Sequence, residues 1–299
     1  QTTAYEMLRS LVGSEMCIRD REMGSVWSRL GTEVHVIEYL DHITPGLDKE
    51  ISSEFMKILK KQNIKFELNT KVERITKNDK GVVIETTNKD SKNKIEADVV
   101  LISVGRKPYT DKLNLEKIGV NLDKKGKIKV NKNFETNVKN VYAIGDVIDG
   151  PMLAHKAEEE GIAVAELIAG QSGHVNYDVI PGVIYTSPEV AYVGKNEEEL
   201  KEKKINFKVG KFPFMANSRA KAINEPEGFV KILAESTTDR VLGVHIIGPH
   251  AGEMIAEMSV AMEFGASSED IARTCHAHPT FSEAIKEAAL SVDKRQIHS

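Results

Sequence analysis

The stretch TCHAHPTFSEA, residues 274–284, gathers residue types that can move protons. His276 and His278 are two apart, so in an extended segment their side chains point to opposite sides and only one can face a given site. Pro279 then favours a turn into the following helix. His278 can act as a general base near neutral pH if Glu283 binds its other ring nitrogen and stabilises the imidazolium. We therefore predict an acid/base pair of His278 and Glu283.

The same residues leave other uses open. Thr280 with Glu283 three residues later is also the pattern of a capping box, in which the carboxylate caps its own helix. A metal site at the two histidines is disfavoured, because no third ligand lies nearby in the sequence. Cys17 and Cys275 are too few for a disulfide framework and lack metal-ligand spacing, so both are expected to be free thiols.

Glu38 ends the strand VHVIE within the β-branched run TEVHVIEYL, residues 32–40. An α/β nucleotide-binding domain places a carboxylate there to accept hydrogen bonds from both hydroxyls of the NAD ribose. A solvated acid at a strand end explains Glu38 equally well. The glycines of the dinucleotide fingerprint should fall near residues 15–20, where the chain reads EMCIRD. Val72 could flank an adenine and Gly105 could let backbone approach a ligand, although such residues are more often core and turn.

Asp146 follows a short strand-like run, YAIGDV. Its carboxylate could project from the strand's carboxyl end and bind a ribityl hydroxyl, or it could be a turn aspartate that bonds its own backbone. A helix begins a few residues later, and its free N–H groups and dipole can stabilise negative charge on an adjacent ring system. Every helix has such an end, so this feature alone is weak. Its residues are Met152, Leu153, Ala154 and His155.

The composition excludes several classes of protein. The chain has 299 residues, of which 40% are hydrophobic and 29% charged, as in globular proteins. A formal net charge of -4 leaves no basic excess for nucleic acid or an anionic membrane surface. No apolar run approaches the roughly 20 residues that cross a bilayer.

Three segments are expected to position these side chains. Residues 22–105 read as helix, strand, helix and strands, with NKDSKNK at 88–94 as a turn and ADVVLISVG at 97–105 as a buried strand, which favours an α/β nucleotide-binding domain. Residues 106–176 supply a short strand at NVYAIGDV and a long helix closed by Gly170. Residues 177–299 alternate strands with helices near 196–204, 250–264 and 280–290, which favours α+β. Residues 1–21 lack the expected strand pattern, and we set them aside as a probable non-native segment.

Several motifs together resemble the dihydrolipoyl dehydrogenase family of flavin and nicotinamide disulfide oxidoreductases. They occur in the family's order, and KFPFMANSRA with AGEM separates this family from glutathione and mercuric reductases. They are IEYLDHITPGLDKEIS, VGRKP, YAIGDV, GPMLAHKAEEEG, VIYTSPEVAYVGK, KFPFMANSRA, IIGPHAGEM and CHAHPTFSEA.

The resemblance implies a fold, cofactors and roles. The fold would be a Rossmann-like NAD-binding remnant, a small central FAD-contacting segment and an α+β C-terminal dimerisation domain. Glu38, Val72 and Gly105 would contact NAD, Asp146 and the backbone of residues 152–155 would contact FAD, and His278 with Glu283 would be the acid/base dyad. Members of the family are homodimers in which this dyad reaches the partner subunit's site, and they serve the lipoyl-bearing acyltransferases of 2-oxo acid dehydrogenase complexes or the glycine cleavage system. The compartment would be a bacterial cytoplasm or the mitochondrial matrix.

The sequence departs from the family at its upstream side. The FAD-binding domain and the CxxxxC redox disulfide are missing, so we expect this chain alone to bind flavin weakly and not to turn over. Two other readings stay open: a different disulfide reductase of the same superfamily, and a non-enzymatic module for dimerisation or docking.

Overall fold

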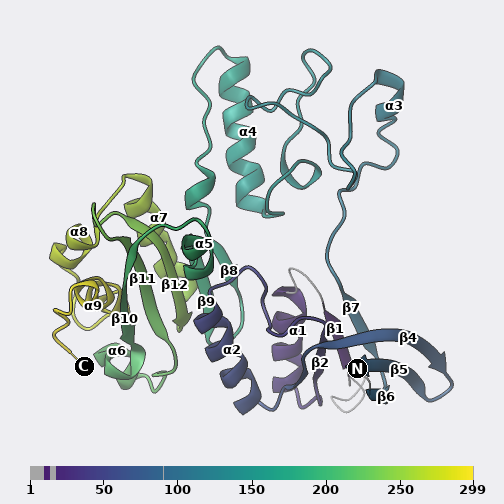
Figure 1. The fold of residues 1–299 in the computed structure, drawn as a ribbon, viewed down its shortest axis with the longest axis horizontal. Helices are drawn as coiled ribbons and strands as arrows, with labels where there is room; N and C mark the ends of the chain where they lie inside the picture. The colour runs from purple at the N-terminus through teal and green to yellow at the C-terminus, as the bar shows by residue number, and fades with distance from the viewer. Residues whose placement is uncertain (1–9, 14–17, 90, 299) are drawn as a thin grey trace. The chain divides into compact units, whose positions relative to one another are not determined.

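A computed structural model describes residues 10–13, 18–89 and 91–298 of the chain. Their contacts form two compact units, one of the described residues up to 105 with those from 181 onward, and one of residues 106–180 (Figure 1). The first and last predicted segments therefore pack together, and the middle one is separate. Each unit is described by itself below.

The first unit contains a four-stranded parallel sheet in the order β3-β2-β1-β7. Helix α1 links β1 to β2 and helix α2 links β2 to β3, so the α/β order expected for a nucleotide-binding fold is present. The strands are β1 (Ser10–Gly13), β2 (His35–Glu38), β3 (Lys65–Glu67) and β7 (Val100–Ser103), and the helices are α1 (Ile18–Arg29) and α2 (Lys49–Lys61).

Strand β1 lies inside the segment that the sequence analysis set aside. It pairs in parallel with both β2 and β7, and α1 begins at Ile18. Residues 10–13 and 18–21 are therefore part of the fold, whereas the non-native origin expected for residues 1–21 stays a prediction. The four-residue run SLVG is too short to show an alternating pattern, and only its two neighbouring strands identify it.

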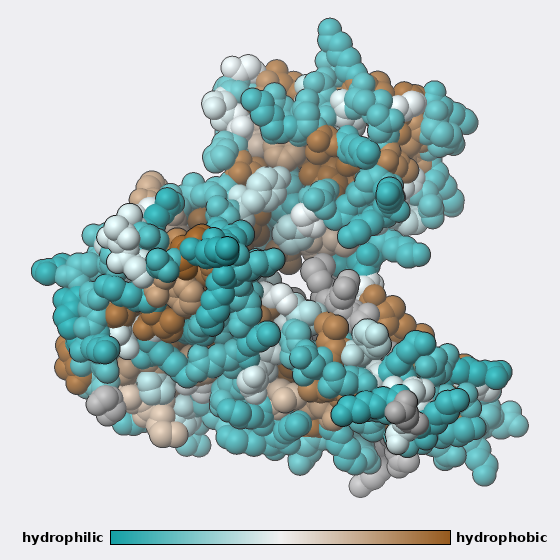
Figure 2. Space-filling model, viewed as in Figure 1, coloured by the Kyte–Doolittle hydropathy of each residue, from teal (hydrophilic) through white to brown (hydrophobic). Residues whose placement is uncertain are grey.

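A three-stranded antiparallel meander follows β3. Its strands are β4 (Thr70–Asn78), β5 (Gly81–Asn88) and β6 (Ser91–Ala97). The turn predicted across 88–94 is present but shorter than expected, because β5 ends at Asn88 and residues 91–94 already pair with β5. Residues 91–94 look like a turn in the sequence because their side chains are exposed, and the surface over the meander is largely hydrophilic in Figure 2.

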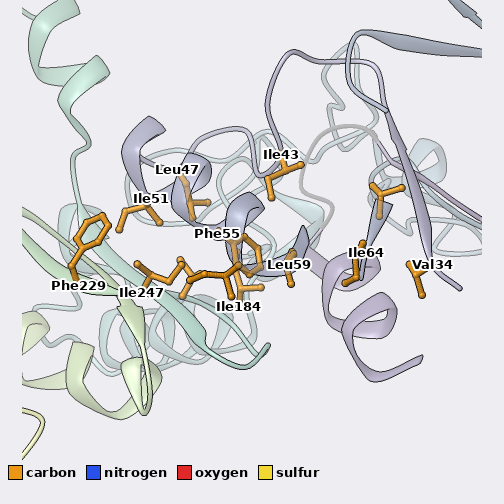
Figure 3. Close-up of a cluster of buried hydrophobic side chains, with 13 residues drawn as sticks. Val34, Ile43, Leu47, Ile51, Phe55, Leu59, Ile64, Ile184, Phe229 and Ile247 are labelled. Atoms are coloured by element: carbon orange, nitrogen blue, oxygen red, sulfur yellow. The ribbon is translucent and has the colours of Figure 1, made fainter. Parts of the chain in front are cut away.

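Helix α2 joins the parallel sheet to the last segment of the chain. Ile51, Phe55, Ile58 and Leu59 form a buried apolar stripe along this helix. Asp48 caps its first turn by accepting from the N–H groups of Glu50 and Ile51. Figure 3 shows the stripe packed against Ile184, Phe229 and Ile247 from the C-terminal sheet. Each such side chain stabilises the fold by roughly 1.5–3 kcal/mol.

The C-terminal sheet is antiparallel, in the order β10-β11-β12-β9-β8. The predicted helices near 196–204, 250–264 and 280–290 are present, and the class is α+β as expected. The strands are β8 (Gly182–Ile184), β9 (Glu189–Gly194), β10 (Phe207–Pro213), β11 (Phe229–Glu235) and β12 (Val241–Gly248), and the helices are α5 (Glu197–Glu202), α6 (Ser218–Ala222), α7 (Ala251–Glu263), α8 (Ser268–Arg273) and α9 (Glu283–Val292).

The second unit is built around α4 (Ala154–Ile168), which ends before Gly170 as predicted, with that glycine at φ +77°. The shorter helical elements are α3 (Leu115–Ile118), η2 (Gly145–Val147) and η3 (Tyr177–Val179). The strand predicted at NVYAIGDV was wrong, because only an isolated bridge from Tyr142 to Glu135 forms there. Its apolar residues instead pack against α4.

Candidate functional site

The parallel sheet brings two of the predicted nucleotide contacts to one edge. Gly13 at the end of β1 is in register with Glu38 on one side and with Ser103 on the other. Gly105 lies two residues beyond Ser103 and has φ +111°, a conformation that favours glycine. This is the carboxyl edge of the strands, where α/β sheets bind ligands.

Glu38 is buried at this edge, and both of its oxygens are occupied. Oε2 lies 3.0 Å from Nη2 of Arg21, and Oε1 accepts from the N–H of Leu40 at 3.1 Å. A buried carboxylate is stable only with such partners. The expected contact with a ribose remains a prediction, and it requires the buried Glu38 side chain to become accessible. Val72 packs beside Ile37 and Ile84 in a small core, in line with the alternative that it is a core residue.

In the second unit, Asp146 lies in η2, and its carboxylate is half exposed. Arg106 reaches it at 3.4 Å through Nη1 and donates to the carbonyl oxygen of Met152 through Nη2. Helix α4 begins at Ala154 after Leu153, which provides no side-chain cap. Arg106 therefore brings the Asp146 turn together with the start of α4, at an end suited to negative charge.

A buried ion pair clamps the turn before Asp146. Nζ of Lys156 lies 3.0 Å from Oε1 of Glu160, and both side chains are fully buried. Glu160 accepts from the N–H of Gly145 at 2.7 Å, and Lys156 donates to the Gly145 carbonyl at 3.2 Å. The Tyr177 hydroxyl also donates to Glu160, and burial, together with this bond, raises the pKa of Tyr177. Sequence reasoning missed this clamp, because a Lys and a Glu four apart on a helix usually form a surface pair.

The contact predicted between His278 and Glu283 is present in the first unit, and their acid/base role stays a prediction. Nδ1 of His278 lies 2.8 Å from Oε1 of Glu283, and the histidine side chain is 65% exposed. Burial alone would raise the pKa of Glu283, but hydrogen bonds from the Thr280 N–H and His278 outweigh it and lower that pKa. Glu283 is therefore an ionised acceptor that holds Nδ1 as a donor and leaves Nε2 as the basic nitrogen.

Only one of the two hydrogen bonds of the predicted capping box is present. Glu283 accepts from the Thr280 N–H at 2.8 Å, but α9 begins at Glu283 itself and the Thr280 hydroxyl donates to the carbonyl of Ala277. Each carboxylate oxygen of Glu283 thus has its own partner. The two functions proposed for this residue are compatible.

His276 has a different set of partners, as the spacing predicted. Its Nε2 lies 2.8 Å from Oε1 of Glu257 on α7, and its Nδ1 lies 3.0 Å from the carbonyl oxygen of Thr274. No cluster of three or more potential metal ligands occurs among the described residues. Cys275 is an exposed free thiol, and Cys17 lies outside the described residues. Across the helices that the structure describes, none has the length and apolar character of a membrane span.

Comparison with protein-family models gives two adjoining matches. Residues 21–161 match "Pyridine nucleotide-disulphide oxidoreductase", and residues 180–289 match "Pyridine nucleotide-disulphide oxidoreductase, dimerisation domain". The chain belongs to this family. The fold class expected from the sequence, a Rossmann-type domain followed by a dimerisation domain, is confirmed.

Individual members of the family are close to the chain. The mitochondrial dihydrolipoyl dehydrogenase of Pisum sativum is 58% identical over 279 residues, which are 93% of this chain and 56% of the pea protein. The mitochondrial dihydrolipoyl dehydrogenase of Bos taurus is 56% identical over 274 residues, covering 90% of this chain and 54% of the bovine protein. The chain therefore spans about half the length of the curated relatives it matches.

Solved structures of the family share the fold. The crystal structure of LpdA from Mycobacterium tuberculosis aligns with a TM-score of 0.85 at 26% identity, over 94% of this chain and 60% of that one. The flavoprotein disulfide reductase RclA from Escherichia coli aligns with a TM-score of 0.83 at 25% identity, over 92% of this chain and 63% of RclA.

Proposed function

We propose that this chain is the downstream part of a dihydrolipoyl dehydrogenase and supplies its acid/base dyad. The 2.8 Å contact from His278 Nδ1 to Glu283 carries the proposal, because it orients the ring and leaves Nε2 free to take a proton. In the proposed step the S–H bond of a dihydrolipoyl group breaks, the electron pair stays on sulfur as a thiolate, and the proton goes to Nε2. The thiolate is the nucleophile in disulfide exchange. Glu283 stabilises the imidazolium that forms.

FAD and NAD are the cofactors that this proposal requires. Bound FAD supplies a two-electron acceptor between the dithiol chemistry and NAD. Asp146 would hold the flavin, together with the uncapped start of α4 at residues 152–155, and the half-exposed carboxylate beside that helix end fits this role. Glu38, Val72 and Gly105 would contact NAD. Gly105 fits close backbone approach, whereas Glu38 does not fit while it is paired with Arg21.

The partners and compartment follow from the same proposal. The match to a dimerisation domain supports a homodimer, in which His278 would act in the partner subunit's site. Lipoyl-bearing acyltransferases of 2-oxo acid dehydrogenase complexes, or the corresponding carrier of glycine cleavage, would be the substrates. The mitochondrial names of the pea and bovine relatives support the mitochondrial matrix rather than a bacterial cytoplasm.

A fusion protein tests the proposal directly. Residues 22–299 would be joined behind the upstream part of the pea enzyme, which the 58% identity makes feasible. We expect a yellow dimer that reduces NAD with dihydrolipoamide. His278→Gln should lower kcat by about 10²- to 10⁴-fold, the usual contribution of a general base.

His298→Gln is a matched control. His298 Nδ1 also lies 2.8 Å from a glutamate, Glu287, on the same helix, and His298 is similarly exposed. His298 is the smallest of the influences that lower the pKa of Glu283, so we expect this variant to keep most of its activity. An active fusion in which His278→Gln performs as well as His298→Gln would overturn the dyad assignment.

A further inference from the structure

His276, the second histidine of the loop that carries His278, ties this loop to helix α7. His276 is two residues before His278, and its side chain is only 6% exposed, against 65% for His278. Glu257, its partner on α7, is 19 residues away in the sequence. The loop between α8 and α9 is therefore anchored at one buried ring.

The partners of His276 determine its protonation state. Nδ1 faces the carbonyl oxygen of Thr274, which can only accept, so Nδ1 carries a hydrogen. Nε2 faces a carboxylate of Glu257, which is an acceptor when ionised, so Nε2 carries one too. A histidine with both nitrogens donating is an imidazolium. The ring therefore makes two hydrogen bonds at once, one of them assisted by charge.

The charged groups around the His276 ring also bear on its doubly protonated form. The hydrogen bond to Glu257 raises the pKa of His276 and outweighs the burial that would lower it. The charge of Lys286 on α9 lowers the pKa of His276. Lys286 also donates to the Thr274 carbonyl oxygen at 2.8 Å. Glu257 from α7 and Lys286 from α9 thus face His276 from the two helices beside it. The loop is held between the two helices at the Thr274 carbonyl and the Glu257 carboxylate.

We propose that His276 is a positioning residue: as a doubly donating imidazolium it fixes the loop that presents His278, and so keeps the His278 ring aligned with Glu283. The catalytic importance of this alignment rests on the proposed function, but the alignment itself does not. Rigid support of this kind matters because an acid/base group must be held to within a fraction of an ångström of its working geometry. No substrate contact is assigned to His276.

The test follows both rings in the full 299-residue chain by NMR of labelled histidine across pH. We expect His276 to titrate above the ordinary value of about 6.5, with both nitrogens protonated below its titration. Glu257→Gln keeps the shape but removes the charge, so it should bring that titration down to about 6.5 or below. His276→Gln should disturb the Nδ1-protonated form of His278 that Glu283 holds.

Arg273→Gln is the control, because Arg273 lies just before the loop but is an exposed residue paired with Glu269. It should leave both rings unchanged. If His276→Gln fails to fold, the nearly isosteric Glu257→Gln still decides the question. The inference is overturned if His276 titrates at or below 6.5 in the unaltered chain, or if His276→Gln leaves the His278 signals as Arg273→Gln does. Loss of activity in the fusion protein, with these signals as expected, would count against the proposed function alone.

Discussion

Nζ of Lys231 lies 2.9 Å from both carboxylate oxygens of Asp48, a residue 183 positions earlier in the chain. Both side chains are buried. Asp48 also caps α2, and Lys231 also reaches Glu197 at 2.5 Å. One buried cation thereby joins the nucleotide-binding segment, the C-terminal sheet and helix α5.

Removing this cation should destabilise the first unit strongly. Lys231→Met leaves Asp48 without its buried partner, and breaking a buried pair in this way costs about 3–5 kcal/mol. Urea unfolding measures the loss. Lys208→Met removes an exposed partner of Asp293 and should change stability little. Equal effects of the two substitutions would show that the Lys231 cluster does not join the segments.

The same cluster predicts a loss of stability in acid. Burial alone would raise the pKa of Asp48, but His245 and the hydrogen bonds from Lys231 outweigh it and lower that pKa. A lowered pKa in the folded state contributes stability that is present above the unfolded value of about 3.9 and disappears as pH falls through the folded value. Unfolding free energies measured from pH 7 to pH 3 should therefore fall less steeply in Lys231→Met. An identical slope in both proteins would contradict this.

The clamp of Lys156 and Glu160 should control the turn that carries Asp146. Glu160→Ala removes the acceptor of the Gly145 N–H and leaves the Lys156 charge buried, at a cost of about 3–5 kcal/mol. Hydrogen exchange at the Gly145 amide should accelerate by at least tenfold. Glu159→Ala changes an exposed neighbour on the same helix and should leave that exchange rate as it is. Protection of Gly145 that survives Glu160→Ala would mean that other contacts hold the turn.

The fusion protein also tests Glu38. Its junction at Glu22 replaces Arg21 with the residue that the pea enzyme has at that position, so the Arg21–Glu38 ion pair is removed. Glu38→Gln should then raise the KM for NAD roughly 10- to 100-fold, as expected for a hydrogen bond to a charged group worth about 1.5–3 kcal/mol. Glu67→Gln at the end of β3 alters a partly buried acid paired with His35 and should not change that KM. A KM that is unchanged in Glu38→Gln would remove Glu38 from the nucleotide site.

Much of the dyad and of the helix pattern could be predicted from sequence. His278 and Glu283 are five residues apart, and the turn at Pro279 is set by local backbone geometry, so the contact needs no distant partner. The stripe on α2 repeats with the period of a helix for the same local reason. The partners of Glu38, Glu160 and Lys231 could not be read in this way. The partner of a buried charge is a residue that only the folded structure places beside it.

The sequence alone determined the family, the succession of helices and strands in the C-terminal domain, and the residues of the acid/base pair, because these depend on local spacing and on motifs in a shared order. Only the tertiary structure decided that β1 is a strand, that Glu38 is paired with Arg21, and that His276 is anchored to α7. Those outcomes depend on neighbours far along the chain. A strand or a buried charge is stable only when its partner is in place, and the residue types by themselves do not say where that partner will be.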